Sequence, residues 1–269
     1  MAAAFDGGDD GGSDPVAQDT RLAGSVSYTS DSDSVRVSSS CDLDIVTYTP
    51  SGTAVGAVVI SHGFIRSGDQ MKGWAEHYAS WGMVAIVPDL CNSSISNTDH
   101  EANAEDIVEL VRQLGVGPVA YVGHSAGGLA SAIALSLDSS AVGGVGLDPV
   151  DSGSLGANAS FSSSFVGLFA EPGMCNSRSN GVDMVNAGAL LVAESGHCDF
   201  ESPRDPICEI ACGQSNPNFT DEDLEDAIRG FSTAALLGMF GDSTTYDAWW
   251  TRGGTHYDAF VASGAISPM

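Results

Sequence analysis

Short, continuous apolar runs recur along the chain, separated by stretches with helical periodicity. The run Ala57–Ile60 contains no polar position, which is typical of a strand covered on both faces. Similar runs predict strands at 84–89, 118–122, 142–147, 165–169 and 189–193. Because these runs alternate with helical segments, we expect an α/β fold in which a mostly parallel central sheet carries helices on both faces.

Helices and edge strands complete this pattern. Helices are predicted at 69–81, from Asp99 or Glu101 to Leu114, at 129–137 and at 221–239, the last of these being the final helix. Gly115 ends the second helix, as a glycine commonly does. Polar and β-branched residues alternate at 34–38 and 42–49, which favours edge strands.

The domain organisation follows from length and composition. The chain has 269 residues, of which 43% are hydrophobic, so residues 23–269 can form one catalytic domain around a large core. Residues 1–22 are acidic and rich in glycine, which predicts a disordered tether. No apolar run is long enough to span a membrane, and no signal segment is visible.

The charge is strongly one-sided. Nine Lys and Arg residues stand against 35 Asp and Glu residues, giving a formal net charge of -26, and Lys72 is the only lysine. Such a surface repels phosphate backbones and anionic lipids, so we exclude nucleic acids and membrane surfaces as partners.

The six cysteines favour disulfides and an exported protein, either secreted or placed in the periplasm or at the cell surface. Six cysteines permit 15 full pairings, and the sequence does not choose among them. A zinc site at His197, Cys208 and Cys212 is the alternative, but its spacing matches no common zinc motif. We expect no metal and no organic cofactor, because the serine mechanism set out below supplies its own nucleophile and proton shuttle.

The stretch Tyr121–Gly128, YVGHSAGG, carries the strongest chemical signal. An apolar strand leads into Gly-His-Ser-Ala-Gly, and a helix-favouring run follows. A serine at the apex of such a turn presents its hydroxyl, and the glycines on either side let the strand and the helix pack closely. Ser125 is therefore the candidate nucleophile. The alternative is a serine that lies in a glycine-rich turn and has no catalytic role.

A serine nucleophile needs an imidazole base, and the base needs a carboxylate that holds its tautomer. His197 directly follows the strand predicted at 189–193, so we favour it over His256, which lies beyond the predicted final helix. Asp148 follows the strand at 142–147 and is the favoured acid. Its rivals are Glu171 and Asp151.

Acyl transfer also requires two donors that face the developing oxyanion. The backbone N–H of Ala126, directly after the nucleophile, is one candidate. The backbone N–H of Phe64, in the loop after the strand Ala57–Ile60, is the other. No insertion between Ser125 and His197 is long enough for a large helical lid, so we expect an open cleft.

The ordered motifs HGF, GHSAGG, GLDPVD and ESGHCDF resemble the α/β-hydrolase superfamily. Within it, they are similar to the group of chlorophyllases, cutinase-like polyester hydrolases and platelet-activating-factor acetylhydrolases, over residues 54–199. The resemblance implies an ester hydrolase with Ser125, Asp148 and His197 as nucleophile, acid and base. Phe64 and Ala126 would be the oxyanion donors, and the acid would be Asp148 rather than Glu171.

Two positions depart from this group. Chlorophyllases have a basic residue where Ala126 stands, and Val150 replaces an aromatic residue that polyester hydrolases often carry. The expected function is a monomeric serine esterase that acts on small or polymeric esters, aromatic polyesters included. Chlorophyllase-like or small-molecule carboxylesterase activity is one alternative, and an acyltransferase or an inactive binding protein on the same fold is another.

Overall fold

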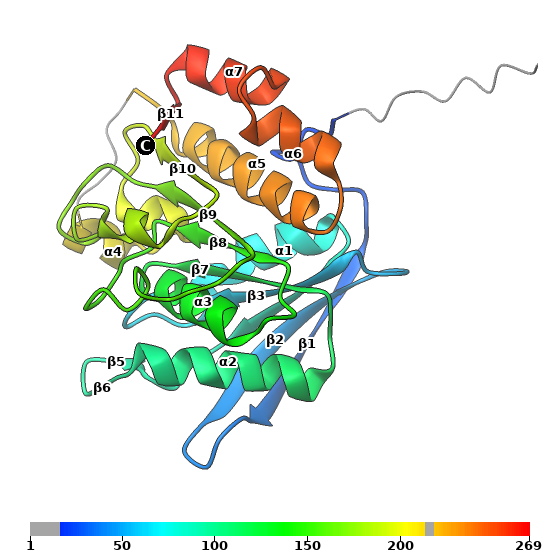
Figure 1. The fold of residues 1–269 in the computed structure, drawn as a ribbon, viewed down its shortest axis with the longest axis vertical. Coiled ribbons are helices and arrows are strands. Elements are labelled where there is room, and N and C mark those ends of the chain that lie inside the picture. Colours follow the sequence, from blue (N-terminus) through cyan, green and yellow to red (C-terminus); the bar gives the residue numbers. More distant parts are fainter. Residues whose placement is uncertain (1–16, 213–217) are drawn as a thin grey trace, which may run out of the picture.

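The computed structural model describes residues 17–212 and 218–269, and most of the predicted tether lies outside them. A nine-stranded sheet forms the centre of the molecule (Figure 1). Its strands are β1 (Tyr28–Arg36), β2 (Asp42–Pro50), β3 (Gly56–Ser61), β4 (Met83–Pro88), β7 (Val119–His124), β8 (Gly143–Leu147), β9 (Ser164–Phe169), β10 (Gly188–Val192) and β11 (Ile266–Pro268).

Across the sheet the order is β1-β2-β4-β3-β7-β8-β9-β10-β11. Neighbouring strands from β4 to β10 pair in parallel, whereas the β1–β2, β2–β4 and β10–β11 pairs are antiparallel. The predicted mostly parallel sheet is therefore confirmed. The antiparallel pairs lie at its two edges, where a hairpin or a terminal segment can return without a crossover helix.

Helices cover both faces of this sheet. They are α1 (Lys72–Ser80), α2 (His100–Leu114), α3 (Ala126–Leu137), α4 (Pro206–Cys212), α5 (Asp221–Met239), α6 (Ser243–Trp250) and α7 (Thr255–Ser263). Figure 1 places α2 and α3 on one face and α1, α5 and α6 on the other. Among the described residues, no helix combines the length and apolarity needed to cross a bilayer.

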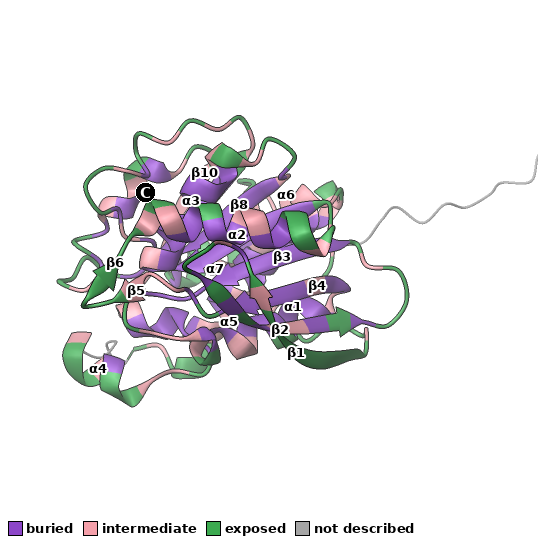
Figure 2. Cartoon of the chain, turned by 90° about the horizontal axis from the view of Figure 1, so that it is seen from below, coloured by how far each residue is buried: buried purple, intermediate pink, exposed green. Residues whose placement is uncertain are grey.

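The core explains why the central strands have no polar positions. Val58 and Ile60 of β3 belong to the cluster packed under α1 and α5, whereas Ala57 and Val59 belong to the cluster under α2 and α3. Successive residues of a strand face opposite sides of the sheet, so a strand covered on both sides must be apolar throughout. Figure 2 shows the central strands as buried.

Local capping sets the helix boundaries that the sequence indicated. The Asp99 side chain accepts a hydrogen bond from the N–H of Ala102 at the start of α2, and Gly115 ends that helix in the left-handed conformation. Thr220 and Asp223 form a capping box at the start of α5. This helix covers 221–239, as predicted.

The prediction that 221–239 is the final helix is wrong. Two short helices, α6 and α7, and the edge strand β11 follow it. At eight and nine residues these helices are too short to show a clear periodicity, and packing of their aromatic residues against α5 decides their formation.

Residues 17–22, which the sequence assigned to the tether, contact the folded chain. The Thr20 hydroxyl is buried and donates a hydrogen bond to the carbonyl oxygen of Gly230 at 2.7 Å. The indole N–H of Trp249 donates to the carbonyl oxygen of Gln18 at 3.0 Å. This segment therefore packs across α5 and α6.

Candidate active site

Ser125 lies at a sharp turn between β7 and α3. Its backbone is strained, with φ of 55° and ψ of -122°, in a region that non-glycine residues rarely adopt. A Cβ at Gly123 would collide with the carbonyl of Gly127, and a Cβ at Gly127 would collide with the carbonyls of Ser61 and His62. Glycine is therefore required at both positions for the strand and the helix to approach this closely.

Asp148 and His197 meet at the carboxyl ends of β8 and β10. The Nδ1 of His197 lies 2.6 Å from Oδ2 of Asp148, whose carboxylate is completely buried. The other carboxylate oxygen, Oδ1, accepts hydrogen bonds from the N–H of Ala170 at 3.0 Å and from Nδ2 of Asn176 at 3.2 Å. Because Nδ1–H donates to the carboxylate, Nε2 of the neutral imidazole is left as the proton acceptor.

Ser125 and His197 line the same cavity, which has a volume of about 220 Å³. Phe64, at the end of the β3 loop, forms part of its wall. Ala126 is the first residue of α3, so its N–H belongs to the group at the helix N-terminus that has no partner within the helix. The tertiary structure thus brings the nucleophile, base and acid expected from the sequence, and both oxyanion residues, to one region.

The rival residues have other contacts. The carboxylate of Asp151 accepts hydrogen bonds from the N–H groups of Gly156 and Ala157, both at 3.0 Å, and so fixes its own loop. Oε1 of Glu171 accepts a hydrogen bond from the N–H of Glu194 at 3.0 Å. His256 lies in α7, stacked on the ring of Trp249 at 4.3 Å between ring centroids. None of these contacts joins one of the three residues to Ser125 or His197, although Glu171 and His197 line a neighbouring cavity.

The cysteines form three disulfides, namely Cys41–Cys91, Cys175–Cys212 and Cys198–Cys208. Cys208 and Cys212 are therefore not available as the thiolates that the zinc alternative needs. The Cys198–Cys208 bridge holds the residue that directly follows His197. Three disulfides are consistent with an extracellular protein.

Three more residues surround this cavity, and the sequence singled out none of them as a site residue. His124 is completely buried, and its Nε2–H donates a hydrogen bond to the carbonyl oxygen of His197 at 3.0 Å. Burial holds the pKa of His124 well below its ordinary value. Arg66 and Glu201 also line the cavity and form an ion pair. Only His124 carried a signal, its place in the GHS motif, and that motif does not show what its ring contacts.

Asn176 was also missed. Its amide bridges the acid and the rim loop, because Nδ2 donates to Asp148 at 3.2 Å and to the carbonyl oxygen of Glu171 at 3.0 Å. The neighbouring Cys175 was a visible signal for this loop, but nothing in the spacing connects Asn176 with Asp148.

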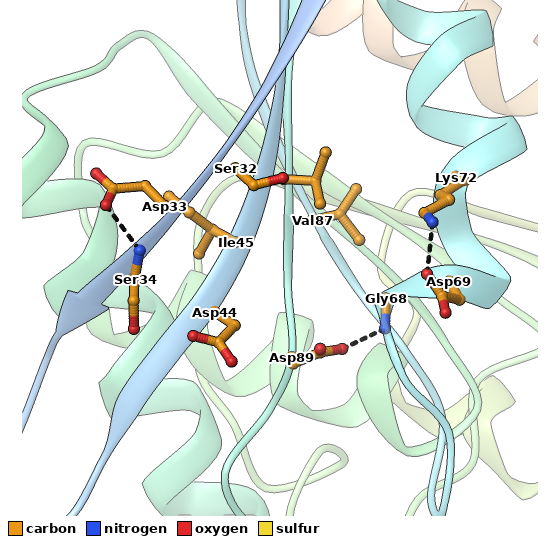
Figure 3. Close-up of a pocket in the computed structure, with 11 residues that line it drawn as sticks. Ser32, Asp33, Ser34, Asp44, Ile45, Gly68, Asp69, Lys72, Val87 and Asp89 are labelled. Atoms are coloured by element: carbon orange, nitrogen blue, oxygen red, sulfur yellow. Dashed lines mark hydrogen bonds and ion pairs between the residues drawn. The ribbon is translucent and has the colours of Figure 1, made fainter.

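A second cavity, of about 290 Å³, lies apart from these residues between β1, β2, β4 and the start of α1 (Figure 3). Asp89 accepts a hydrogen bond from the N–H of Gly68 there, and Lys72 pairs with Asp69. None of the predicted site residues lines this cavity.

The sheet order, with a strained serine turn after one strand and an acid and a histidine after later strands, defines an α/β-hydrolase architecture. Residues 56–156 match the family model described as the alpha/beta hydrolase fold. The matched segment runs from β3 to the loop after β8 and includes Phe64, Ser125 and Asp148. The chain therefore has the α/β-hydrolase fold, and the match supports a place in that superfamily. No curated protein matches the chain.

The α/β-hydrolase fold is compatible with a hydrolase, although the fold alone does not fix the reaction. The finer grouping with chlorophyllases, polyester hydrolases or platelet-activating-factor acetylhydrolases goes beyond what the match covers. The reaction has to be argued from the residues of the site.

Proposed function

We propose that this protein is a serine carboxylic ester hydrolase that forms an acyl-enzyme on Ser125. The observation that carries the proposal is the 2.6 Å contact between His197 Nδ1 and the buried Asp148 carboxylate, at the cavity that Ser125 lines. Because this contact occupies Nδ1, Nε2 of His197 is the ring nitrogen left to act as the base toward Ser125, as activation of a serine hydroxyl requires.

In the proposed mechanism, His197 takes the proton of Ser125 as its hydroxyl oxygen attacks the ester carbonyl carbon. Asp148 stabilises the imidazolium, and the N–H groups of Phe64 and Ala126 hold the oxyanion. The tetrahedral intermediate collapses, the C–O bond to the alcohol breaks, and His197 gives its proton to the leaving alkoxide. Water then repeats the attack on the acyl-enzyme and regenerates the serine.

The rim of the cavity supports bulky or polymeric esters, including aromatic polyesters such as PET. Phe64 and Ile65 line the cavity and are 38% and 53% exposed, so its wall reaches the surface. Met174, Ile207 and Ile210 are also exposed, and each directly precedes a residue that lines the cavity, namely Cys175, Cys208 and Ala211. An apolar rim of this kind accommodates a substrate that is larger than the cavity itself.

One observation favours a second candidate, a small-molecule carboxylesterase. A cavity of about 220 Å³ lies below the range of about 300 to 1,000 Å³ typical of small-molecule sites, so a short acyl group fits it best. Chlorophyllase-like activity, acyl transfer to another alcohol and an inactive binding protein are the other outcomes that a test must separate. We further propose a monomer that is exported from the cell.

The proposal is tested with a series of p-nitrophenyl esters, from acetyl to long acyl, and with an aromatic polyester film. We expect Ser125→Ala and His197→Ala to lower kcat by about 10⁴-fold or more, and Asp148→Asn by about 10⁴-fold. His256→Ala is the matched control, because this histidine lies in α7, and it should retain activity.

A fluorophosphonate probe completes the test. It should label wild type at Ser125 and should not label Ser125→Ala. A folded wild type that is neither labelled nor active on any ester would contradict the proposal and favour the binding protein. If the protein cleaves the soluble esters but not the polyester film, the proposal of a polymeric substrate is wrong. Transfer of the acyl group to added alcohol in preference to water would indicate an acyltransferase.

A further inference from the structure

A buried ion pair joins two of the segments that form the cavity. Nε of Arg66 donates to Oε1 of Glu201 at 2.7 Å, and the two side chains are 17% and 0% exposed. Nη1 of Arg66 also lies 3.5 Å from Oδ2 of Asp205. Arg66 closes the turn that carries Phe64, because its N–H donates to the carbonyl oxygen of Gly63. Glu201 directly follows the short helix His197–Phe200.

His124 adds the third segment, since it directly precedes Ser125. Its ring lies 4.5 Å from the ring of His197 between centroids, and its Nε2–H donates to the carbonyl oxygen of His197. Its Nδ1 lies 3.9 Å from Oε1 of Glu201. Arg66, Glu201 and His124 thus form a network that joins three segments of the site. These are the turn at residues 63–66 with the proposed oxyanion donor Phe64 (the oxyanion turn), the turn at Ser125, and the short helix that begins at His197.

This network is unfavourable as a purely structural feature. Within residues 17–212 and 218–269, Oε2 of Glu201 and Nδ1 of His124 are buried without a hydrogen-bond partner. Burial raises the pKa of Glu201, although Arg66 acts in the opposite direction. Apolar residues of similar volume commonly make such a site more stable than a buried ion pair does. Buried unsatisfied groups of this kind require an explanation, and their place beside the reacting residues suggests a functional one.

The backbone of the oxyanion turn is strained at Ile65, and the network can stabilise this conformation. Ile65, between Phe64 and Arg66, has a φ of 51°, which is an outlier for a β-branched residue. Such a conformation persists only where the surroundings over-determine it. Here the N–H of Ile65 donates to the carbonyl oxygen of Ser93 at 2.7 Å, and the Arg66 ion pair fixes the next residue.

We propose that Arg66, Glu201 and His124 are positioning residues, which hold the Phe64 turn and the His197 segment in register with Ser125. The inference rests on the proposed ester hydrolysis. A small displacement of either segment moves the oxyanion donor or the base away from the reacting atoms, and a shift of about 1 Å can lower the rate of chemistry about 100-fold. The network therefore acts on kcat rather than on KM.

The central test replaces both charges with apolar residues, in the double variant Arg66→Met/Glu201→Leu. Removing both partners of the 2.7 Å pair leaves no fully buried charge unpaired, because Asp205, the second partner of Arg66, is 21% exposed. The thermal unfolding midpoint should therefore stay at or above that of wild type. We expect kcat on p-nitrophenyl acetate to fall by about 10- to 100-fold, while KM changes by less than about threefold. The matched control is Arg21→Met/Asp19→Leu, an ion pair of 2.6 Å away from the cavity, which should keep both constants.

The single variant Arg66→Lys keeps a charge opposite Glu201 and covers the case in which the double variant fails to fold. A lysine presents one point charge in place of the guanidinium fork, so we expect a smaller fall in kcat, about three- to tenfold, again at constant KM. A folded double variant or a folded Arg66→Lys with wild-type kcat overturns the inference, and so does a change confined to KM. Failure of the proposed function is visible separately, because wild type itself would then not hydrolyse the ester.

Discussion

Three buried histidines, His62, His77 and His124, differ from His197 in that neighbouring backbone groups fix their protonation. His62 accepts a hydrogen bond from the N–H of Leu90 at Nε2, and its Nδ1–H donates to the carbonyl oxygen of Gly63. Burial lowers the pKa of each of the three, so each is neutral at pH 7. Of these four described histidines, His197 is the one whose ring nitrogen lies within 3 Å of a carboxylate, and on this ground we propose it as the base.

His77 gives a prediction for stability against pH. Burial lowers its pKa from 6.5 to about 4, and its Nε2–H donates to the carbonyl oxygen of Thr20. As the pH falls below 6.5, the unfolded chain binds a proton at this residue and the folded chain does not. The contribution of His77 to the unfolding free energy is therefore fully present above pH 6.5 and is lost as the pH falls toward 4. The shift corresponds to roughly 3 kcal/mol.

We expect His77→Gln, whose amide can still donate to Thr20, to lose part of this pH dependence. Urea unfolding of wild type and variant at pH 7.5 and pH 4.5 measures it, with His256→Gln as the comparison because His256 is only partly buried. An equal loss of unfolding free energy in wild type and His77→Gln between the two pH values would show that His77 is not the group that titrates.

At the scale of elements, the helix α4 depends on covalent links. It has seven residues, which is too short for stability in isolation, and its Ile207 and Ile210 are 71% and 87% exposed. Cys208 and Cys212 tie it to Cys198 and Cys175. Figure 2 shows α4 at the edge of the molecule with much of its surface exposed. Disulfides therefore replace apolar packing in holding this part of the rim.

We predict that Cys175→Ser/Cys212→Ser loosens α4 selectively. The variant should lose amide protection in α4 and raise KM for bulky esters, since Cys175 and Cys212 line the cavity. Hydrogen exchange and ester kinetics measure the two effects. Cys41→Ser/Cys91→Ser is the control. The Cys41–Cys91 disulfide joins residues 50 positions apart and Cys175–Cys212 joins residues 37 positions apart, so loss of either lowers the unfolding free energy by a similar amount, about 4 kcal/mol at most. Unchanged α4 protection, or equal loss in the control, would contradict the prediction.

At the scale of the whole molecule, the net charge of -26 dominates the surface. Few of the 35 acidic residues have a basic partner available, because only nine Lys and Arg residues exist. Like charges repel one another more in the compact state than in the unfolded chain, and salt screens this repulsion.

We therefore predict that NaCl stabilises the fold. Between 0.02 and 0.3 M NaCl the Debye length shortens from above 10 Å to below it, and the unfolding free energy should rise by about 1 kcal/mol or more. For a chain of this size, each kcal/mol raises Tm by about 2–4 °C. Thermal unfolding across this range measures the effect, with sucrose as the uncharged comparison. A Tm that stays constant or decreases as NaCl is raised from 0.02 to 0.3 M would contradict the prediction.

The sequence by itself determined the elements whose signal is local. Continuous apolar runs indicated the buried strands, and the capping residues placed the ends of α2 and α5. The glycines around Ser125 indicated the turn because a side chain at either position cannot fit. Composition alone set the surface charge. Each of these features depends on residues within a few positions of one another.

Only the tertiary structure decided the features that join distant parts of the chain. These are the disulfide pairing, the contact of Asn176 with Asp148, the ion pair between Arg66 and Glu201, and the stacking of His256 on Trp249. Arg66 and Glu201 are 135 positions apart, and no local pattern connects them. Such contacts exist because parallel strands bring their carboxyl ends to one edge of the sheet, so strand order rather than sequence distance sets which side chains meet.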